Sequence, residues 1–225
     1  MKNLAGLLKL DTKLITPYWK WLVMFFGIAL LMAIVMGQQM GQSGMVFIIS
    51  FAMFSSTFTA FNFENTDKSN LNVLFATLPT NRKALLFTRY LYTMIVLAIS
   101  LVVAIVVAVI LDLAFANEMS FQVYLMFVCL AFGLFSINVA FPYPFFYKKG
   151  YVKAKIFLWI PLIFFMIVLN FSAILSVFNV EIGFDIFVTM FSNMTLTKII
   201  AVSVGVVALV ISYIVSRRIY LRKDF

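Results

Sequence analysis

The sequence predicts an all-α polytopic membrane protein, with six transmembrane helices in a single domain that covers residues 1–225. Two features of composition and one of pattern predict this fold class. Hydrophobic residues make up 64% of the chain and charged residues only 11%, whereas globular domains have about 45–50% and about 25%. The mean hydropathy is +1.09, and long apolar runs recur along the chain. This composition excludes soluble enzymes, nucleic-acid-binding domains and disordered chains, because so few charges cannot cover a soluble surface.

Each apolar run is long enough to cross a bilayer, which takes about 20 residues in a helix. The predicted spans are residues 18–36, 45–63, 91–111, 121–141, 156–178 and 199–215. Polar turns at 37–44 and 112–120 separate the first span from the second and the third from the fourth, and Pro142 and Pro144 end the fourth. The first run is too long for a signal peptide and no small-x-small cleavage site follows it, so we expect a retained helix.

The placement of Lys and Arg predicts the orientation of the chain. All but one of the 17 basic residues lie in the N-terminal segment, in the loops after spans two and four, and in the C-terminal tail. Lys198 is the exception. Because cytoplasmic loops carry the excess of Lys and Arg, both termini are expected in the cytoplasm of a multi-pass plasma-membrane protein. The net charge of +9 is then a topology signal, and no nucleic-acid partner is expected.

The residue types that carry chemistry are scarce. The chain has one Cys, Cys129, and no His, which excludes an internal disulfide, a zinc or haem site and every His-based triad. No GxxxxGK[ST] motif is present, so the chain cannot hydrolyse ATP alone. We expect no catalytic residue, no metal site and no cofactor on this chain.

Polar residues within the spans are few. No ionisable residue lies near the middle of a span, which argues against a proton-coupled carrier. Asn138 and Asn170 lie at membrane depth and either hydrogen-bond between helices or bind a ligand. Ser55, Ser56 and Thr59 give span two a polar inner end, which either lines a pathway or bonds back to its own helix.

Two further segments have amphipathic patterns outside the spans. Near the N-terminus, Leu4, Leu7 and Leu8 fall on one helix face and lysines on another, which favours an interfacial helix on anionic lipid. Before span six, Phe184, Phe187, Met190 and Phe191 have helical spacing. The outer segment 179–195 is therefore either an interfacial or re-entrant helix or an extension of a span.

The loop Glu64–Tyr90 after span two is predicted to contain a third amphipathic helix. Thr66 or Asp67 can cap it, and Pro79 ends it. One apolar stripe has the i, i+3, i+4, i+7 spacing of a helix face: Leu71, Leu74, Phe75 and Leu78. This short helix either lies on lipid headgroups or docks into a groove of a cytoplasmic protein.

Two motifs resemble those of a known family. Glu64, the leucine-rich helix and the run Leu78-Pro79-Thr80-Asn81-Arg82 resemble the "E…LLxxLPxxR" loop of type-2 ABC transporter (ABC-2) permeases. The tail 217–225, a basic stretch that closes on Asp-Phe, resembles the usual ending of these permeases. The layout of an interfacial helix, six spans and a loop helix is similar to theirs over the whole chain.

The resemblance implies a division of labour with soluble ATPase subunits, which bind the ATP and Mg²⁺. The helix after span two would be the coupling helix that sits in a groove of the ATPase. The residues implied in docking are a stripe and its two flanking residues: Leu71, Leu74, Phe75 and Leu78, with Glu64 and Arg82. A second permease subunit, identical or paralogous, would complete the pathway.

The expected function is therefore that of a non-catalytic permease subunit of an ATP-driven exporter. Its expected cargo is amphipathic or hydrophobic: a peptide toxin, an antimicrobial peptide, a lipid or a drug. The alternative is a non-transporting membrane scaffold or immunity protein, whose loop helix recruits a cytoplasmic partner without turnover.

Overall fold

The computed structural model describes the chain except residues 1, 41–42, 69–81, 116–119, 170–192 and 223–225. The described residues form helices and no strand, which confirms the all-α fold class. In chain order these are α1 (Lys2–Ile15), η1 (Thr16–Tyr18), α2 (Trp19–Met40), α3 (Ser43–Thr59), α4 (Phe61–Lys68), α6 (Arg82–Ala114), α7 (Phe121–Ala140), α8 (Tyr143–Lys149), α9 (Tyr151–Ala154), α10 (Ile156–Leu169) and α13 (Met194–Leu221).

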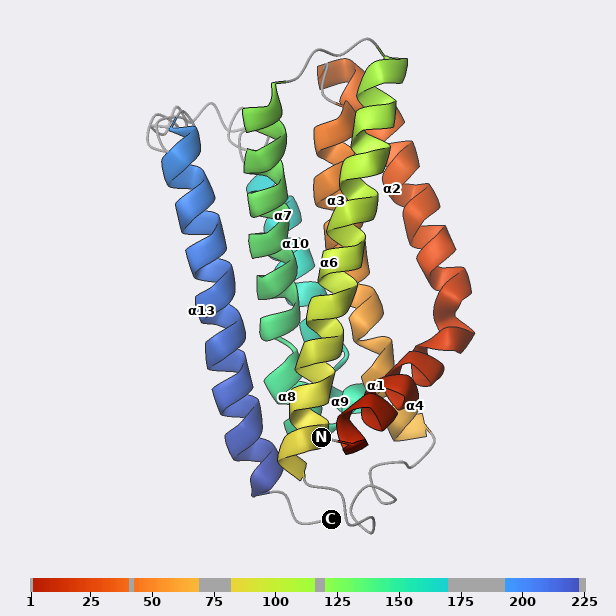
Figure 1. Ribbon diagram of the computed structural model, residues 1–225, viewed down its shortest axis with the longest axis vertical. Helices are drawn as coiled ribbons and strands as arrows, with labels where there is room; N and C mark the ends of the chain where they lie inside the picture. Colours follow the sequence, from red (N-terminus) through yellow and green to blue (C-terminus); the bar gives the residue numbers. More distant parts are fainter. Residues whose placement is uncertain (1, 41–42, 69–81, 116–119, 170–192, 223–225) are drawn as a thin grey trace.

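The long helices run side by side as a bundle (Figure 1). α1 turns across one end of this bundle, where α4, α8, α9 and the last turns of α13 also lie (Figure 1). We call this the basic end, because it carries the lysines of α1, α8 and α9. Lys198 lies in the first turns of α13, at the opposite end. The N-terminal helix and the end of the last long helix therefore lie on one side of the bundle.

Five helical runs in the described part are long and apolar enough to cross a membrane. They are Gly6–Val35, Ser43–Lys68, Lys83–Ala114, Phe121–Lys149 and Met194–Leu221. Because α1 turns across the bundle end, α2 is the spanning part of the first run. These runs confirm a multi-pass membrane protein. The predicted span 156–178 begins as α10, and its remainder lies outside the described residues.

The structure corrects several predicted boundaries. α2 continues through Met40, so most of the predicted turn 37–44 is helical. α6 runs from Arg82 to Ala114, so Asp112 belongs to a helix and not to the predicted outer turn. Thr66 and Asp67, the predicted caps of the loop helix, lie inside α4. The boundaries differ because a helix ends where its backbone hydrogen bonds end, and in these helices the hydrogen bonds continue past the last residue of the apolar run.

Small residues bring α2, α3 and α6 close together. Ala29 and Ala33 of α2 and Ala104 and Ala108 of α6 have no exposed surface. Between them, α3 contributes large aromatic side chains such as Phe47, which is also fully buried. In lipid, helices associate through such close packing, because the hydrophobic effect provides no driving force between them.

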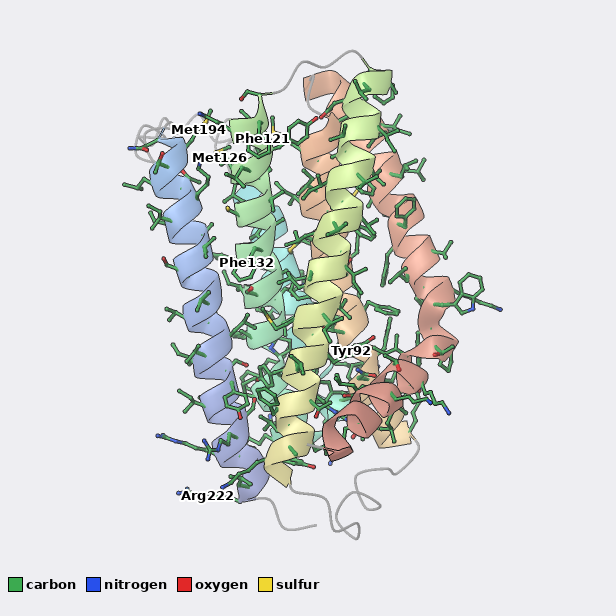
Figure 2. The ribbon with its side chains drawn as sticks, viewed as in Figure 1. Tyr92, Phe121, Met126, Phe132, Met194 and Arg222 are labelled. Atoms are coloured by element: carbon green, nitrogen blue, oxygen red, sulfur yellow. The ribbon has the colours of Figure 1, made fainter. Side chains whose placement is uncertain are left out.

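α7 and α13 also meet through small residues. A Cβ added at Gly133 of α7 would lie 2.8 Å from the carbonyl oxygen of Ala201, and one at Gly205 of α13 would lie 2.9 Å from the Phe132 ring. Phe132 is labelled between these two helices in Figure 2. The pair Ala201 and Gly205 therefore marks a close contact between α13 and α7.

Candidate functional site

The short helix α4 lies at the basic end and leads directly into residues 69–81, where the docking stripe is expected. Leu71, Leu74, Phe75 and Leu78 are outside the described residues, as is the side chain of Arg82. Glu64 is inside α4 and pairs with Lys68, with 2.6 Å between Oε1 and Nζ. We call α4 and its contacts with α1, α6, α8 and α9 the α4 seat, and take it as the candidate functional site.

The end of α1 is fastened to α4. The Asn65 side-chain amide donates a hydrogen bond to the Leu14 carbonyl. The Tyr18 hydroxyl donates to Asn65 Oδ1 over 3.1 Å, and the Tyr18 ring stacks on Phe61 with 4.7 Å between centroids. Asn65 thus bonds to both sides of the junction between α1 and η1, which holds α1 at a fixed angle to α4.

A buried ion pair joins α1 to α6. Arg89 Nε lies 3.9 Å from Asp11 Oδ1, and the two side chains are 5% and 2% exposed. Arg89 also donates a hydrogen bond to the Thr66 hydroxyl of α4, and its guanidinium lies 4.5 Å from the centroid of the Phe63 ring. Burying a charge is costly unless it is paired, so Arg89 ties α1, α4 and α6 together at one point.

This ion pair was not predicted from the sequence, which placed Arg89 among the basic loop residues. The structure puts it inside α6 and buried. A local signal was present on the partner side: Leu7, Asp11 and Ile15 follow one another at four-residue spacing, and all three are buried. An acidic residue in the middle of an apolar stripe indicates a paired carboxylate.

The other side of α4 contacts the turn between α8 and α9. The Asp67 carboxylate accepts a hydrogen bond from the Tyr151 backbone N–H. Gly150 has φ 78°, a conformation that favours glycine, and a Cβ there would lie 2.9 Å from Asp67 Oδ2. Burial, and then the negative charge of Glu64, raise the pKa of the Tyr151 phenol. The turn is thus shaped to receive the α4 carboxylates.

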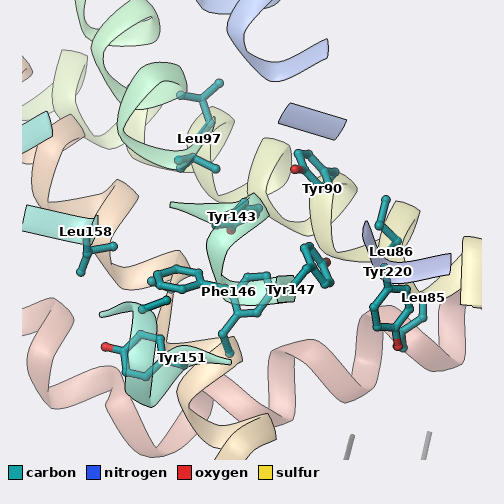
Figure 3. Packing of buried hydrophobic residues seen from close by; sticks show 14 of the residues in the cluster. Leu85, Leu86, Tyr90, Leu97, Tyr143, Phe146, Tyr147, Tyr151, Leu158 and Tyr220 are labelled. Atoms are coloured by element: carbon teal, nitrogen blue, oxygen red, sulfur yellow. The ribbon is translucent and has the colours of Figure 1, made fainter. Parts of the chain in front are cut away.

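Aromatic rings fill the centre of the seat. The Phe63 centroid lies 4.9 Å from that of Tyr143 and 5.1 Å from those of Phe146 and Tyr147. Figure 3 shows Tyr143, Phe146 and Tyr147 packed together beside Tyr90 and Tyr220. Tyr90 extends this network to α13, because its hydroxyl bonds to Ser212 over 2.8 Å and to Ser216 over 3.0 Å.

A model of the family described as ABC-2 family transporter protein matches residues 6–221, nearly the whole chain. The chain belongs to the ABC-2 family. It is therefore a membrane permease component of an ABC transporter, and this family associates with an ABC ATPase. No curated protein and no solved structure matches the sequence.

The seat of this ABC-2 permease does not enclose room for a cargo. A cavity of about 20 Å³ lies among side chains of α4, α6, α8 and α13, lined by Phe63, Asp67, Leu85, Arg89, Phe146, Tyr147 and Tyr220. One water needs about 10–15 Å³ by this measure. The cavity has room for a single water at most, so the seat is a packed joint between helices.

In this ABC-2 permease, each of the polar residues Ser55, Ser56 and Thr59 of the second span donates its hydrogen bond to a carbonyl of its own helix, α3. Ser55 donates to the Phe51 carbonyl over 2.7 Å, and Thr59 donates to the Ser56 carbonyl over 2.7 Å. Ser56 donates to the Met53 carbonyl and accepts a hydrogen bond from the Asn138 amide of α7. Thr59 accepts one from the Tyr143 hydroxyl over 3.1 Å.

Asn138 is thus placed at a contact between α7 and α3, with its side chain buried. Asn170 lies outside the described residues. Among the residues that the structure describes, no group of three or more His, Cys, Asp or Glu side chains could hold a metal ion.

Proposed function

We propose that this ABC-2 permease is the membrane subunit of an ATP-driven exporter, in which the α4 seat transmits movements of the ATPase to the bundle. The observation that carries the proposal is the position of α4. It directly precedes the predicted docking stripe, and polar contacts join it to α1, α6 and α9.

A helix so placed is suited to transmit force. Its eight residues form a rigid segment of about 12 Å at 1.5 Å per residue. Hydrogen bonds and a buried charge hold it on three sides, and such contacts resist sliding because their energy depends on direction. A displacement of residues 69–81 would therefore carry α1 and the α8–α9 turn along with α4.

The energy source is proposed to lie on the partner. ATP and Mg²⁺ would be held by the soluble ATPase, since the sequence has neither a phosphate-binding loop nor an ionisable residue near the middle of a predicted span. The single-water cavity of the seat leaves no chamber there, which supports a pathway shared with a second permease subunit. Amphipathic or hydrophobic cargo suits a conduit whose helices are this apolar.

The test is co-purification of the ATPase, which we expect to be encoded beside this chain, in mild detergent. The double variant Leu74→Asp/Phe75→Asp puts two carboxylates on the docking stripe and should reduce ATPase recovery at least tenfold, because buried unpaired charges disrupt an apolar groove. The matched control Gly6→Asp/Thr12→Asp adds the same charge on the exposed face of α1 and should recover the ATPase normally.

Undiminished recovery of the ATPase with Leu74→Asp/Phe75→Asp would contradict the proposed docking role of the stripe. A second readout separates a transporter from a scaffold. In reconstituted complexes, Thr66→Val removes the hydroxyl that accepts a hydrogen bond from Arg89. This should change the rate of ATP hydrolysis while the ATPase stays bound. An unchanged rate would indicate recruitment without coupling, as expected of a scaffold.

A further inference from the structure

Four lysines gather around the turn that receives α4. Lys148 and Lys149 end α8, Lys153 lies in α9, and Lys155 joins α9 to α10. All four are exposed, and within the described part of the chain none of them forms an ion pair. The nearby Asp67 is engaged by the Tyr151 backbone. The turn therefore carries four lysine charges that form no ion pair with any acidic residue in the described part of the chain.

Apolar side chains continue directly from these lysines along α9 and α10. Val152, Ile156 and Trp159 are 63%, 65% and 52% exposed. Ile156 and Trp159 are three residues apart in α10, which places them on one face of that helix, and Ile160 and Ile163 extend that face. The exposed surface thus changes from basic to apolar within about two helical turns. We call the surface of Lys148, Lys149, Val152, Lys153, Lys155, Ile156 and Trp159 the α9 elbow.

The α9 elbow is held in place by the protein core. Gly150 allows the chain to turn between α8 and α9. The Lys149 ammonium lies 5.8 Å from the centroid of the Phe157 ring, within the range of a cation–π contact. Phe157 in turn stacks on Phe145 with 4.0 Å between centroids. The Lys149 charge is therefore held next to the apolar face by a contact within the protein.

We propose that the α9 elbow is a binding site for an anionic phospholipid. The lysines would contact the phosphate and the negative headgroup, while Val152, Ile156 and Trp159 would contact the glycerol region and the first acyl carbons. Charge complementarity selects a negative ligand, and the adjoining exposed apolar face selects one with a hydrocarbon chain. A zwitterionic lipid satisfies only the second requirement. The inference does not depend on the proposed export function.

The experiment uses Trp159 as a local reporter. The chain has three tryptophans, and Trp19→Phe/Trp21→Phe leaves Trp159 alone. The full-length protein is placed in phosphatidylcholine nanodiscs that contain a minor fraction of acyl-brominated phosphatidylglycerol or, in parallel, brominated phosphatidylcholine. We expect the brominated phosphatidylglycerol to quench Trp159 more strongly than its share of the lipid predicts, and the brominated phosphatidylcholine to quench in proportion to its share.

The preference should depend on the four lysines. Replacing all four, as Lys148→Gln, Lys149→Gln, Lys153→Gln and Lys155→Gln, should lower the relative affinity for phosphatidylglycerol by about fivefold per lysine. The matched control is Lys9→Gln, Lys13→Gln, Lys20→Gln and Arg218→Gln. It removes the same charge from exposed positions outside the elbow and should leave the preference unchanged.

A salt titration keeps the proposal testable if the elbow variant folds poorly. In the single-tryptophan protein, raising the ionic strength should weaken the preference, because salt screens exposed charges. Equal quenching by the two brominated lipids, a preference that survives the four glutamines, or one that salt leaves unchanged would overturn the proposal. Loss of ATPase binding in the elbow variant without any lipid preference would overturn it in favour of an acidic protein surface.

Discussion

The α4 seat at the basic end and the contact of α2, α3 and α6 are built from different chemistry. In the seat, α4 meets its neighbours through Asn65, Thr66 and Asp67, which bond to α1, α6 and α9. Between α2, α3 and α6, the buried residues are mainly alanine and phenylalanine, and Phe26 packs edge-on against Phe47 and Phe51. The polar contacts of the α4 seat fix the orientation of its helices, whereas the apolar contact of α2, α3 and α6 fixes the distance between them.

This difference explains how the helices of such a permease can move at the basic end while the bundle stays assembled. Close packing of small residues holds helices together in lipid without specifying their rotation strongly. Hydrogen bonds and a buried ion pair do specify rotation, because misaligned buried polar groups lose their partners. The seat is therefore the part that should respond as a unit, while the apolar contact keeps the spans together.

At the end of the bundle opposite the basic end, one polar contact joins helices that otherwise meet through apolar residues. Asp112 Oδ1 accepts a hydrogen bond from the Gly44 backbone N–H over 2.9 Å, and Asp112 Oδ2 accepts one from the Tyr124 hydroxyl. The carboxylate lies at the N-terminus of α3, where the helix dipole favours negative charge. Asp112 therefore caps α3 from α6.

The largest expected effect is at the buried ion pair of the seat. Arg89→Ala leaves Asp11 buried without its cation and removes the donor to Thr66. It should lower the free energy of unfolding by about 3–5 kcal/mol, measured by SDS titration in mixed micelles. Arg218→Ala, at an exposed position, should change it little.

The double variant Asp11→Leu/Arg89→Leu should recover much of that loss, because an apolar pair can replace a buried ion pair at little cost. Equal losses for Arg89→Ala and Arg218→Ala would mean that the ion pair does not hold the seat together.

A middle-sized effect is expected at Gly44, where α3 packs tightly against α6. At Gly44, an added Cβ would clash with Asp112 Oδ2 and would lie 2.9 Å from the Ala108 carbonyl oxygen. Gly44→Ala should therefore destabilise by about 1–3 kcal/mol through overpacking. At Gly27 of α2 nothing lies within 4 Å, so Gly27→Ala should stabilise by about 0.5–1 kcal/mol. Thermal unfolding of both variants in one detergent checks the sign, and a stable Gly44→Ala protein would contradict the close approach.

The smallest effect separates two neighbouring serines. Ser56→Ala removes the acceptor of the Asn138 amide and should cost about 0.6 kcal/mol, the average for a hydrogen bond between membrane helices. Ser55 donates to the Phe51 carbonyl of its own helix, and such a bond does not stabilise a helix, so Ser55→Ala should cost less than Ser56→Ala. SDS titration ranks the two, and a larger loss for Ser55→Ala would show that the α3–α7 contact does not use Ser56.

The spans could be predicted from the sequence because hydropathy is a local property. The predicted span 121–141 differs from α7 by one residue at its end. The predicted span 91–111 falls well inside α6, because the helical backbone continues through polar residues at both ends. Local pattern also predicted α1 as an amphipathic helix, and the stripe Leu71–Leu78, which lies outside the described residues, stays a prediction.

The polar joints could not be predicted, because each pairs residues that are distant in the sequence. Gly44 and Asp112 are 68 positions apart, and nothing near either residue indicates the other. Arg89 and Asp112 each lie next to the end of an apolar run, so hydropathy assigned both to loops. Only the packing of α1 and α3 against α6 shows that these charges are buried.

We expect α4 and α1 to move together when the ATPase acts. Spin labels at Lys9→Cys and Lys68→Cys report the distance between these helices, and labels at Lys68→Cys and Lys198→Cys report the distance from the seat to the opposite end. Both pairs are made with Cys129→Ala and measured by pulsed EPR in the complex with its ATPase.

On addition of ATP, we expect an unchanged Lys9–Lys68 distance distribution and a shifted Lys68–Lys198 distribution. A Lys9–Lys68 distribution that shifts or broadens, while the Lys68–Lys198 distribution stays constant, would contradict this expectation.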